Sequence, residues 1–287
     1  MLASTSLAPA RRELSPEDAE MWTGLIEHRC GAWFSEGRMY VLRNCLWRQM
    51  QMHGLDRYSA YYRLVLENRG EWDRLAEGIV NRETRFFRHQ ASFTALSEEL
   101  LPGIMDRNLR QGGSQLRLWS AGCSSGEEAY SLAIAASELS NCGLCQFEVL
   151  GSDISTEALA AAERGRYGQR ALTDTPVEIQ RRHFERCGNE FQVSRGIRAL
   201  TRFEYFNLFD PATYPAVMQD VIFCQNVFIY FREAMRADVV ARLARCLRPG
   251  GYLLAAPGEL AGLPVPGFEW VRLRHTMVLR RSEGPGV

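Results

Sequence analysis

A loop of small residues runs from Ser120 to Gly126 and leads directly into two adjacent acids, Glu127 and Glu128. Placed between a strand and a helix, such a loop lets a ligand approach the backbone closely. Carboxylates at the start of this helix repel a phosphate and attract an ammonium group. The pattern therefore favours a cationic or amine-bearing ligand. The alternative, that one of the two acids only complements the helix dipole, stays open at this point.

A further acid, Asp153, stands at the end of the next predicted strand. In nucleotide-binding α/β folds, an acid at this place accepts hydrogen bonds from the hydroxyl groups of a ribose. Asp153 is therefore a candidate ribose ligand. Neither the loop nor the acid identifies the ligand when taken in isolation.

The elements that must position these residues are strands that alternate with helices. Four apolar stretches predict strands at residues 116–121, 147–154, 221–227 and 252–256. The segments between them predict helices at residues 126–139, 156–163 and 233–247. This alternation predicts an α/β fold with a parallel, doubly wound sheet, and residues 268–279 predict a final strand pair.

Between the second of these helices and the third strand, Gly188-Asn189 predicts a turn between two short strands. Residues 197–206 predict a third strand beside them. We therefore expect a small antiparallel insertion that spans about residues 178–206.

The N-terminal part of the chain has a different pattern. Residues 1–14 predict a flexible tail, and Ser15-Pro16 predicts the N-cap and first residue of a helix. Helical periodicity returns at residues 35–53, 57–68 and 71–80, and again at 92–109. We predict an all-helical domain over residues 15–90 and an α/β domain over residues 91–287.

Composition narrows the class of protein. The formal net charge is zero and all 34 basic residues are arginine, so we expect no nucleic-acid partner. No apolar run is long enough to span a membrane and no signal peptide is evident, which predicts a cytoplasmic protein without membrane insertion. Cys142 and Cys145 form a lone CxxC without a second ligand pair, so no metal site is expected, and the cysteines are expected to be reduced and buried.

Four segments, in this order along the chain, resemble the chemotaxis protein methyltransferase (CheR) family. They are residues 83–88 (ETRFFR), 121–132 (AGCSSGEEAYSL), 151–154 (GSDI) and 223–231 (FCQNVFIYF). The resemblance implies a class I methyltransferase with a Rossmann-like sheet, preceded by a helical domain. It also implies S-adenosylmethionine as cofactor, S-adenosylhomocysteine as product, and glutamate methyl esters on a methyl-accepting chemotaxis receptor.

The resemblance also implies roles for single residues. Glu128 or Glu127 takes the amino group of the cofactor and Asp153 its ribose, while Arg88 and Tyr230 lie closest to the transferred methyl group. Further cofactor-binding candidates are Arg82, Thr84, Arg88, Gly122, Asn207, Leu208, Gln225 and Asn226. Two of them depart from the family pattern, because Arg82 replaces an asparagine and Gln225 an arginine.

Other residues near these motifs are expected to play no direct part in the chemistry. His89 is interpreted as a polar surface residue. The four aromatic side chains of the motifs are expected to pack in the core; they are Phe86, Phe87, Phe228 and Phe231.

A glutamate substrate, whose reference pKa is about 4.3, is already a carboxylate nucleophile near neutral pH, so no general base is required. The resemblance also implies that a receptor's C-terminal peptide can add along the edge of the inserted strands, and we expect a monomer. Two alternatives stay open. One is a module that binds the cofactor or its product and signals without turnover; the other is an amino-group methyltransferase, although the prolines of the Asn-Pro-Pro-aromatic motif are missing around Asn226.

Overall fold

The computed structural model describes residues 13–79, 83–110, 112–113, 115–139 and 146–283. Most of the predicted tail, Arg82 and the Cys142–Cys145 motif lie outside these residues. The chain divides into two compact units, Met1–Asn81 and Arg82–Val287. This division comes earlier in the sequence than the expected boundary after residue 90, because the segment that follows Arg82 packs on the α/β unit. None of the described helices is both long and apolar enough to cross a membrane.

The first unit is a group of helices around one apolar core. Ser15 begins the first helix as predicted: its Oγ accepts a hydrogen bond from Asp18 N at 3.1 Å. The core is centred on side chains such as Trp22, Leu42, Tyr61 and Leu75. The helices are α1(Pro16–Cys30), the short η1(Glu36–Arg38), α2(Met39–Met52), α3(Tyr58–Glu67) and α4(Arg69–Ile79).

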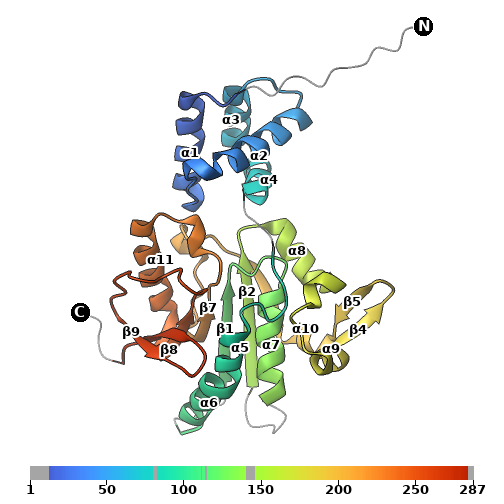
Figure 1. The fold of residues 1–287 in the computed structure, drawn as a ribbon, viewed down its shortest axis with the longest axis vertical. Helices are drawn as coiled ribbons and strands as arrows, with labels where there is room; N and C mark the ends of the chain where they lie inside the picture. Colours follow the sequence, from blue (N-terminus) through green and yellow to red (C-terminus); the bar gives the residue numbers. More distant parts are fainter. Residues whose placement is uncertain (1–12, 80–82, 111, 114, 140–145, 284–287) are drawn as a thin grey trace. The chain divides into compact units, whose positions relative to one another are not determined.

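The second unit is built on one seven-stranded sheet (Figure 1). Its strand order is β6-β2-β1-β7-β8-β10-β9. The first five strands are parallel, and β10 pairs antiparallel with both β8 and β9. The strands are β1(Gln115–Ala121), β2(Gln146–Asp153), β6(Thr201–Tyr205), β7(Gln219–Phe223), β8(Leu247–Leu254), β9(Phe268–Arg272) and β10(Met277–Arg281).

Side chains alternate between the two faces of this sheet and form a core on each. In β1, Leu116 and Leu118 join the core that includes α7(Glu127–Leu139). Trp119 and Ala121 join the opposite core, which includes α11(Glu233–Cys246). The α7 side of the sheet also contacts the continuous helical segment α5(Gln90–Ala95), η2(Leu96–Leu100) and α6(Leu101–Arg110). Both faces are therefore covered, which confirms the predicted doubly wound fold.

The small antiparallel sheet was predicted correctly in type but not in all its strands. Its order is β3(Arg166–Gly168), β5(Glu190–Val193), β4(Phe184–Cys187), with the predicted Gly188-Asn189 turn joining β4 and β5. The prediction of residues 197–206 as its third strand was wrong. Residues Arg195–Ala199 form a helical turn, α10, and Thr201–Tyr205 pairs parallel with β2 in the main sheet.

The remaining helical elements of the second unit are short. Two of them connect the strands of the small sheet, η4(Gln169–Leu172) and α9(Val177–His183), while α8(Thr156–Arg164) follows β2. Single turns also occur at η5(Pro211–Thr213), after β6, and at η6(Phe228–Tyr230), after β7.

The packing of Gly151 in β2 leads to a stability prediction. An added Cβ at Gly151 would lie 2.5 Å from the Phe203 ring and 3.0 Å from the Ala129 Cβ. We expect Gly151→Ala to overpack this site and destabilise the second unit by about 1 to 3 kcal/mol. A Cβ added at Gly196, in α10, would point into open space with no neighbouring atom within 4 Å, so Gly196→Ala is the matched control. Thermal unfolding of both variants checks the prediction, and equal melting temperatures would contradict it.

Candidate active site

The predicted site residues of the second unit gather at one edge of the main sheet. The parallel strands β6, β2, β1 and β7 lie side by side, and their paired residues Asp153–Tyr205, Ala121–Ser152 and Ser120–Phe223 bring the carboxyl ends of these strands together. Asp153 ends β2 at this edge. The loops that leave the edge include the small-residue loop and the segments that contain Asn207 and Asn226. In open α/β sheets, ligands bind at such an edge.

Asp153 organises the loops on both sides of it. Its Oδ2 accepts a hydrogen bond from Ser124 N at 2.8 Å, and its Oδ1 accepts one from Ser155 N at 2.9 Å. A carboxylate has about four lone-pair sites, which lets one acid accept several hydrogen bonds. The acid therefore both shapes the loop after β1 and presents its oxygens at the sheet edge.

The loop after β1 adopts a conformation that requires its glycines. Gly122 has φ +87°, and an added Cβ there would lie 2.5 Å from Val227 Cγ2. Gly126 has φ +95°, and an added Cβ would lie 2.7 Å from the Ala162 Cβ. The Ser124 Oγ in the same loop is buried and has no hydrogen-bond partner among the described residues. An unpartnered buried hydroxyl at this place fits a site that binds a polar ligand.

Two acids begin α7, Glu127, which is buried, and Glu128, which is half-buried. Burial raises the pKa of Glu128 to about 8, against the hydrogen bond that its Oε1 accepts from Ser120 Oγ at 2.6 Å. Glu259 raises this pKa further, and Arg88 lowers it. Burial also raises the pKa of Glu127 to about 7, and the Ser125 hydroxyl opposes that shift with a hydrogen bond of 2.7 Å. Two adjacent acids with raised pKa values are suited to a cationic group, which favours their ionised form.

The segment that carries Thr84 and Arg88 is tied to the main body of the second unit. Phe86 N donates to Ala171 O at 2.9 Å, and Phe87 N donates to Ser131 Oγ, also at 2.9 Å. Phe87 has φ +55°, a strained value for a residue with a Cβ. Arg88 Nη1 donates to Glu83 O at 2.8 Å, and Thr84 is half-buried in the same turn. The segment that holds both predicted residues is therefore tied to α7, and Arg88 is near enough to Glu128 to lower its pKa.

The loop after β7 lies beside this turn. His89 Nε2 and Asn226 Oδ1 are hydrogen-bonded at 2.9 Å, and both residues have φ +61°. The interpretation of His89 as a surface residue was therefore wrong, because its half-buried ring joins two segments of the site. Tyr230 follows in η6 and is half-buried.

Two predicted cofactor ligands have side chains that make contacts within the protein. Gln225 is buried, and its Nε2 donates to Ser92 Oγ at 3.0 Å. The Asn207 side chain accepts a hydrogen bond from Phe209 N at 3.0 Å. For these residues, cofactor contact stays a prediction. Arg82, which the resemblance also assigns to the cofactor, lies outside the described residues.

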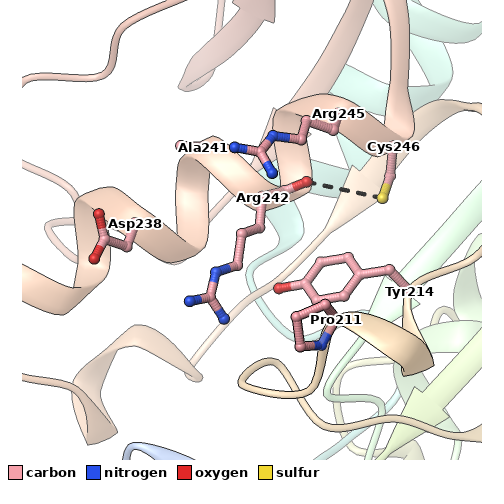
Figure 2. Close-up of a pocket in the computed structure, with 7 residues that line it drawn as sticks. All are labelled: Pro211, Tyr214, Asp238, Ala241, Arg242, Arg245 and Cys246. Atoms are coloured by element: carbon pink, nitrogen blue, oxygen red, sulfur yellow. Dashed lines mark hydrogen bonds between the residues drawn. The ribbon is translucent and has the colours of Figure 1, made fainter.

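Leu208 is held in place from outside the site. Its carbonyl accepts hydrogen bonds from the Tyr214 hydroxyl at 2.8 Å and from Arg242 Nη1 at 3.2 Å. Figure 2 shows the Arg242 side chain reaching from α11 toward Pro211 and Tyr214. A hollow of about 540 Å³ lies between these elements, and none of the predicted site residues lines it. The two hydrogen bonds brace the Asn207–Leu208 segment.

The prediction that the four motif phenylalanines pack in the core is confirmed for three of them, whereas the fourth is half-buried. Phe86, Phe228 and Phe231 are buried, and Phe87 is half-buried against Phe93.

The cysteines are free where they are described, and most are buried, but Cys187 is exposed at the end of β4. That part of the cysteine prediction was wrong.

Sequence reasoning missed Glu259, which lies in the turn after β8. Its side chain is 6% exposed, and its Oε2 accepts hydrogen bonds from Ala256 N at 2.8 Å and from Asn226 N at 3.0 Å. Its Oε1 accepts one from Ile229 N at 3.3 Å. A single acid after Pro257-Gly258 carries no local signal of this role, because its partners are distant in sequence.

Comparison with known proteins places this arrangement in one family. Residues 82–261 match the family model described as CheR methyltransferase, SAM binding domain, and residues 17–79 match CheR methyltransferase, all-alpha domain. The chain is 31% identical over 256 residues to chemotaxis protein methyltransferase 1 of Pseudomonas aeruginosa, which covers 86% of this chain and 92% of that protein.

Two further relatives span nearly all of this chain. The chemotaxis protein methyltransferase of Vibrio parahaemolyticus is 32% identical over 275 residues, which are 93% of this chain and 98% of that protein. The probable biofilm formation methyltransferase WspC of Pseudomonas aeruginosa is 32% identical over 268 residues, which are 91% of this chain and 61% of that protein.

The raised pKa of Glu128 leads to a prediction about pH and stability. The folded state keeps this proton up to about pH 8, whereas the unfolded chain releases it near the ordinary value of 4.5. Stability should therefore fall as pH rises between these values, by at most about 1.4 kcal/mol per pH unit for this group. We expect Glu128→Gln to remove this component, so that the variant gains most over the unmodified protein at pH 8.

Urea unfolding at pH 5, 6.5 and 8 measures the effect. Glu185→Gln, which changes an exposed glutamate of β4, is the control for loss of one acidic group. If Glu128→Gln and the unmodified protein lose stability in parallel across this range, the pKa assigned to Glu128 is wrong.

Proposed function

Because this chain belongs to the CheR methyltransferase family, we propose that its methyl acceptor is the side-chain carboxylate of glutamates in a methyl-accepting chemotaxis receptor. The chain is an S-adenosylmethionine-dependent methyltransferase of the chemotaxis type. The proposal concerns the acceptor and the residues that serve it.

The observation that carries the proposal is the composition of the sheet edge. Half-buried acids line one side of it, at Glu128 and Asp153, while Arg88 and Tyr230 come from the two segments that the His89–Asn226 hydrogen bond joins. The described residues of this edge that hold the motifs include one histidine, His89, which is already hydrogen-bonded to Asn226. Such a site can orient a substrate that is already ionised.

The residues of the sheet edge fit the cofactor that the family uses. The carboxylate of Glu128 suits the amino group of S-adenosylmethionine, and the carboxylate of Asp153, at the end of β2, suits its ribose. The positive φ of Gly122 and its close approach to Val227 leave no room for a side chain at this place in the loop. Binding of an ammonium group beside Glu128 favours the ionised acid, so cofactor binding should release a proton near neutral pH.

The methyl transfer itself needs orientation more than proton transfer. When bound, S-adenosylmethionine supplies a methyl group on a positively charged sulfur. An oxygen of the glutamate carboxylate can take this methyl group directly, as the bond between the methyl carbon and sulfur breaks. Because opposite charges are neutralised in this step, strong polar solvation of the reactants slows it. Arg88 is therefore assigned to shape the pocket and place the substrate rather than to clamp the attacking carboxylate. The Tyr230 hydroxyl is assigned to contact the reacting groups, which are the accepting carboxylate and the transferred methyl group.

The small sheet offers a place for the receptor beyond its methylated helices. β4 forms one edge of this sheet in the described structure, and an extended peptide can add to such an edge by main-chain hydrogen bonds. We assign this edge to a C-terminal receptor peptide, where the receptor has one. The protein is proposed to act in the cytoplasm as a monomer.

Transfer of a tritiated methyl group to a soluble receptor fragment tests the acceptor. We expect label on the fragment that mild base releases, because carboxyl methyl esters hydrolyse and N-methyl groups do not. A fragment whose methylatable glutamates are changed to alanine is the control. Base-stable label would instead identify an amino-group methyltransferase, and cofactor binding without any transfer would identify a signalling module.

The role of Tyr230 can be tested by removing its hydroxyl alone. We expect Tyr230→Phe to lower the single-turnover rate at saturating cofactor and substrate by about tenfold or more, with little change in affinity for S-adenosylhomocysteine. The half-buried Tyr252, on β8, provides the matched control Tyr252→Phe. Transfer at the unmodified rate by Tyr230→Phe would show that this tyrosine only packs.

A further inference from the structure

Glu259 is a buried acid that lies outside the predicted motifs but contacts the loop that holds two of their residues. Its two oxygens accept hydrogen bonds from three backbone amides, those of Asn226, Ile229 and Ala256. Two of these amides belong to the loop after β7. The third, Ala256 N, belongs to its own turn and holds the carboxylate in place.

The hydrogen bond to Ile229 N takes the place of a local helix cap. The short helix η6(Phe228–Tyr230) begins after Val227, whose apolar side chain makes no cap hydrogen bond. The amide groups in the first turn of a helix have no partner within the helix, and one left buried and unpaired costs free energy. Glu259 accepts from Ile229 N in this turn and so fixes where the turn that ends in Tyr230 begins.

The hydrogen bond to Asn226 N holds a residue in an unfavourable backbone conformation. Asn226 has φ +61°, and its side chain is at the same time hydrogen-bonded to His89. A non-glycine residue keeps such a conformation when its surroundings determine it from more than one side. Glu259 holds the main chain of Asn226, and His89 holds its side chain.

Arg236 strengthens the same arrangement from α11. Its Nη1 donates to Glu259 O at 3.2 Å and its Nε donates to Phe231 O, also at 3.2 Å. The residue after η6 and the main chain of Glu259 are thus tied to one guanidinium group. Both ends of the segment from Asn226 to Phe231 are fixed relative to Glu259.

We propose that Glu259 is a positioning residue for methyl transfer, which sets the places of Asn226 and Tyr230 by holding the main chain between them. This inference rests on the proposed role of Tyr230 in the reaction. In this role Glu259 acts through the loop after β7, by the hydrogen bonds that it accepts from Asn226 N and Ile229 N.

A competing explanation is that Glu259 acts at a distance through its charge. Its charge contributes to the raised pKa of Glu128. If this were its main effect, neutralising it would move the pH dependence of cofactor binding and leave the loop unchanged. The two explanations therefore differ in what they predict for the amides of the loop.

Glu259→Gln separates these explanations because it keeps the size of the side chain but leaves one acceptor oxygen. At least one of the amides of Asn226, Ile229 and Ala256 then loses its partner. We expect amide hydrogen exchange, measured by NMR, to become about tenfold faster or more at Asn226 or Ile229. Amides of β1 should be unchanged. Glu269→Gln, an exposed glutamate paired with Arg280, is the matched control for the lost charge.

A double-mutant cycle tests the link to catalysis. We expect Glu259→Gln to slow single turnover by about tenfold to hundredfold, as displacement of a catalytic group by about 1 Å does. If Glu259 acts through Tyr230, the double variant with Tyr230→Phe should be no more than about threefold slower than the slower single variant. Independent roles would instead multiply the two effects, which would overturn the proposal.

The exchange measurement also keeps this inference distinct from the proposed function. Unchanged exchange at Asn226 and Ile229 in Glu259→Gln would overturn the positioning role whatever the acceptor is. Absence of base-labile transfer by the unmodified protein would overturn the proposed acceptor, while faster exchange in the variant would still support the hold of Glu259 on the loop. A shift in the pH dependence of binding with unchanged exchange would favour the competing charge effect.

Discussion

Buried backbone amides need acceptors, and at the carboxyl edge of this sheet carboxylates supply them. Loops that leave parallel strands have no neighbouring strand to pair with, so their buried amides need acceptors from elsewhere. Asp153 accepts from Ser124 N and Ser155 N, and Glu259 accepts from Asn226 N and Ile229 N. The shape of the site depends on these hydrogen bonds, because the residues assigned to chemistry lie on the loops that they hold.

The same edge holds two acids whose ionised form the described residues only partly balance. Glu127 is buried and Glu128 half-buried at the start of α7, both have raised pKa values, and Arg88 lowers the pKa of Glu128. Burial of unbalanced acids is unfavourable for the protein alone. A cationic ligand stabilises the ionised form of these acids. The two acids therefore suit the positively charged amino group of the cofactor.

The reaction proposed for this site explains why rigid placement matters more than acid–base chemistry. A carboxylate acceptor is ionised near neutral pH, and its transfer step neutralises charge, so added polar groups near the acceptor bring little benefit. What remains for the protein is to bring the two reactants together in the right orientation. Strained residues held from two sides, such as Asn226 and Phe87, are consistent with this demand.

The sequence alone determined the α/β class, the preceding helical domain, the doubly wound sheet and the family motifs. These features depend on local periodicity, helix caps such as Ser15 and short contiguous motifs, all of which can be read within a few residues. The boundaries were close for β1 and β2, which are long apolar strands. They failed for residues 197–206, because whether a short segment pairs with the small sheet or with β2 depends on which edge is open in the folded chain.

Only the tertiary structure decided which of the candidate residues meet. His89 and Asn226 are 137 residues apart in sequence, and Gln225 and Ser92 are 133 apart, yet each pair shares a hydrogen bond. Glu259 meets its partners from the turn after β8 in the same way. No local pattern marks His89 or Glu259, since a histidine or a glutamate on its own is typical of a surface position. Their roles arise because parallel strands bring distant loops to one edge, where each buried amide and side chain must find a partner.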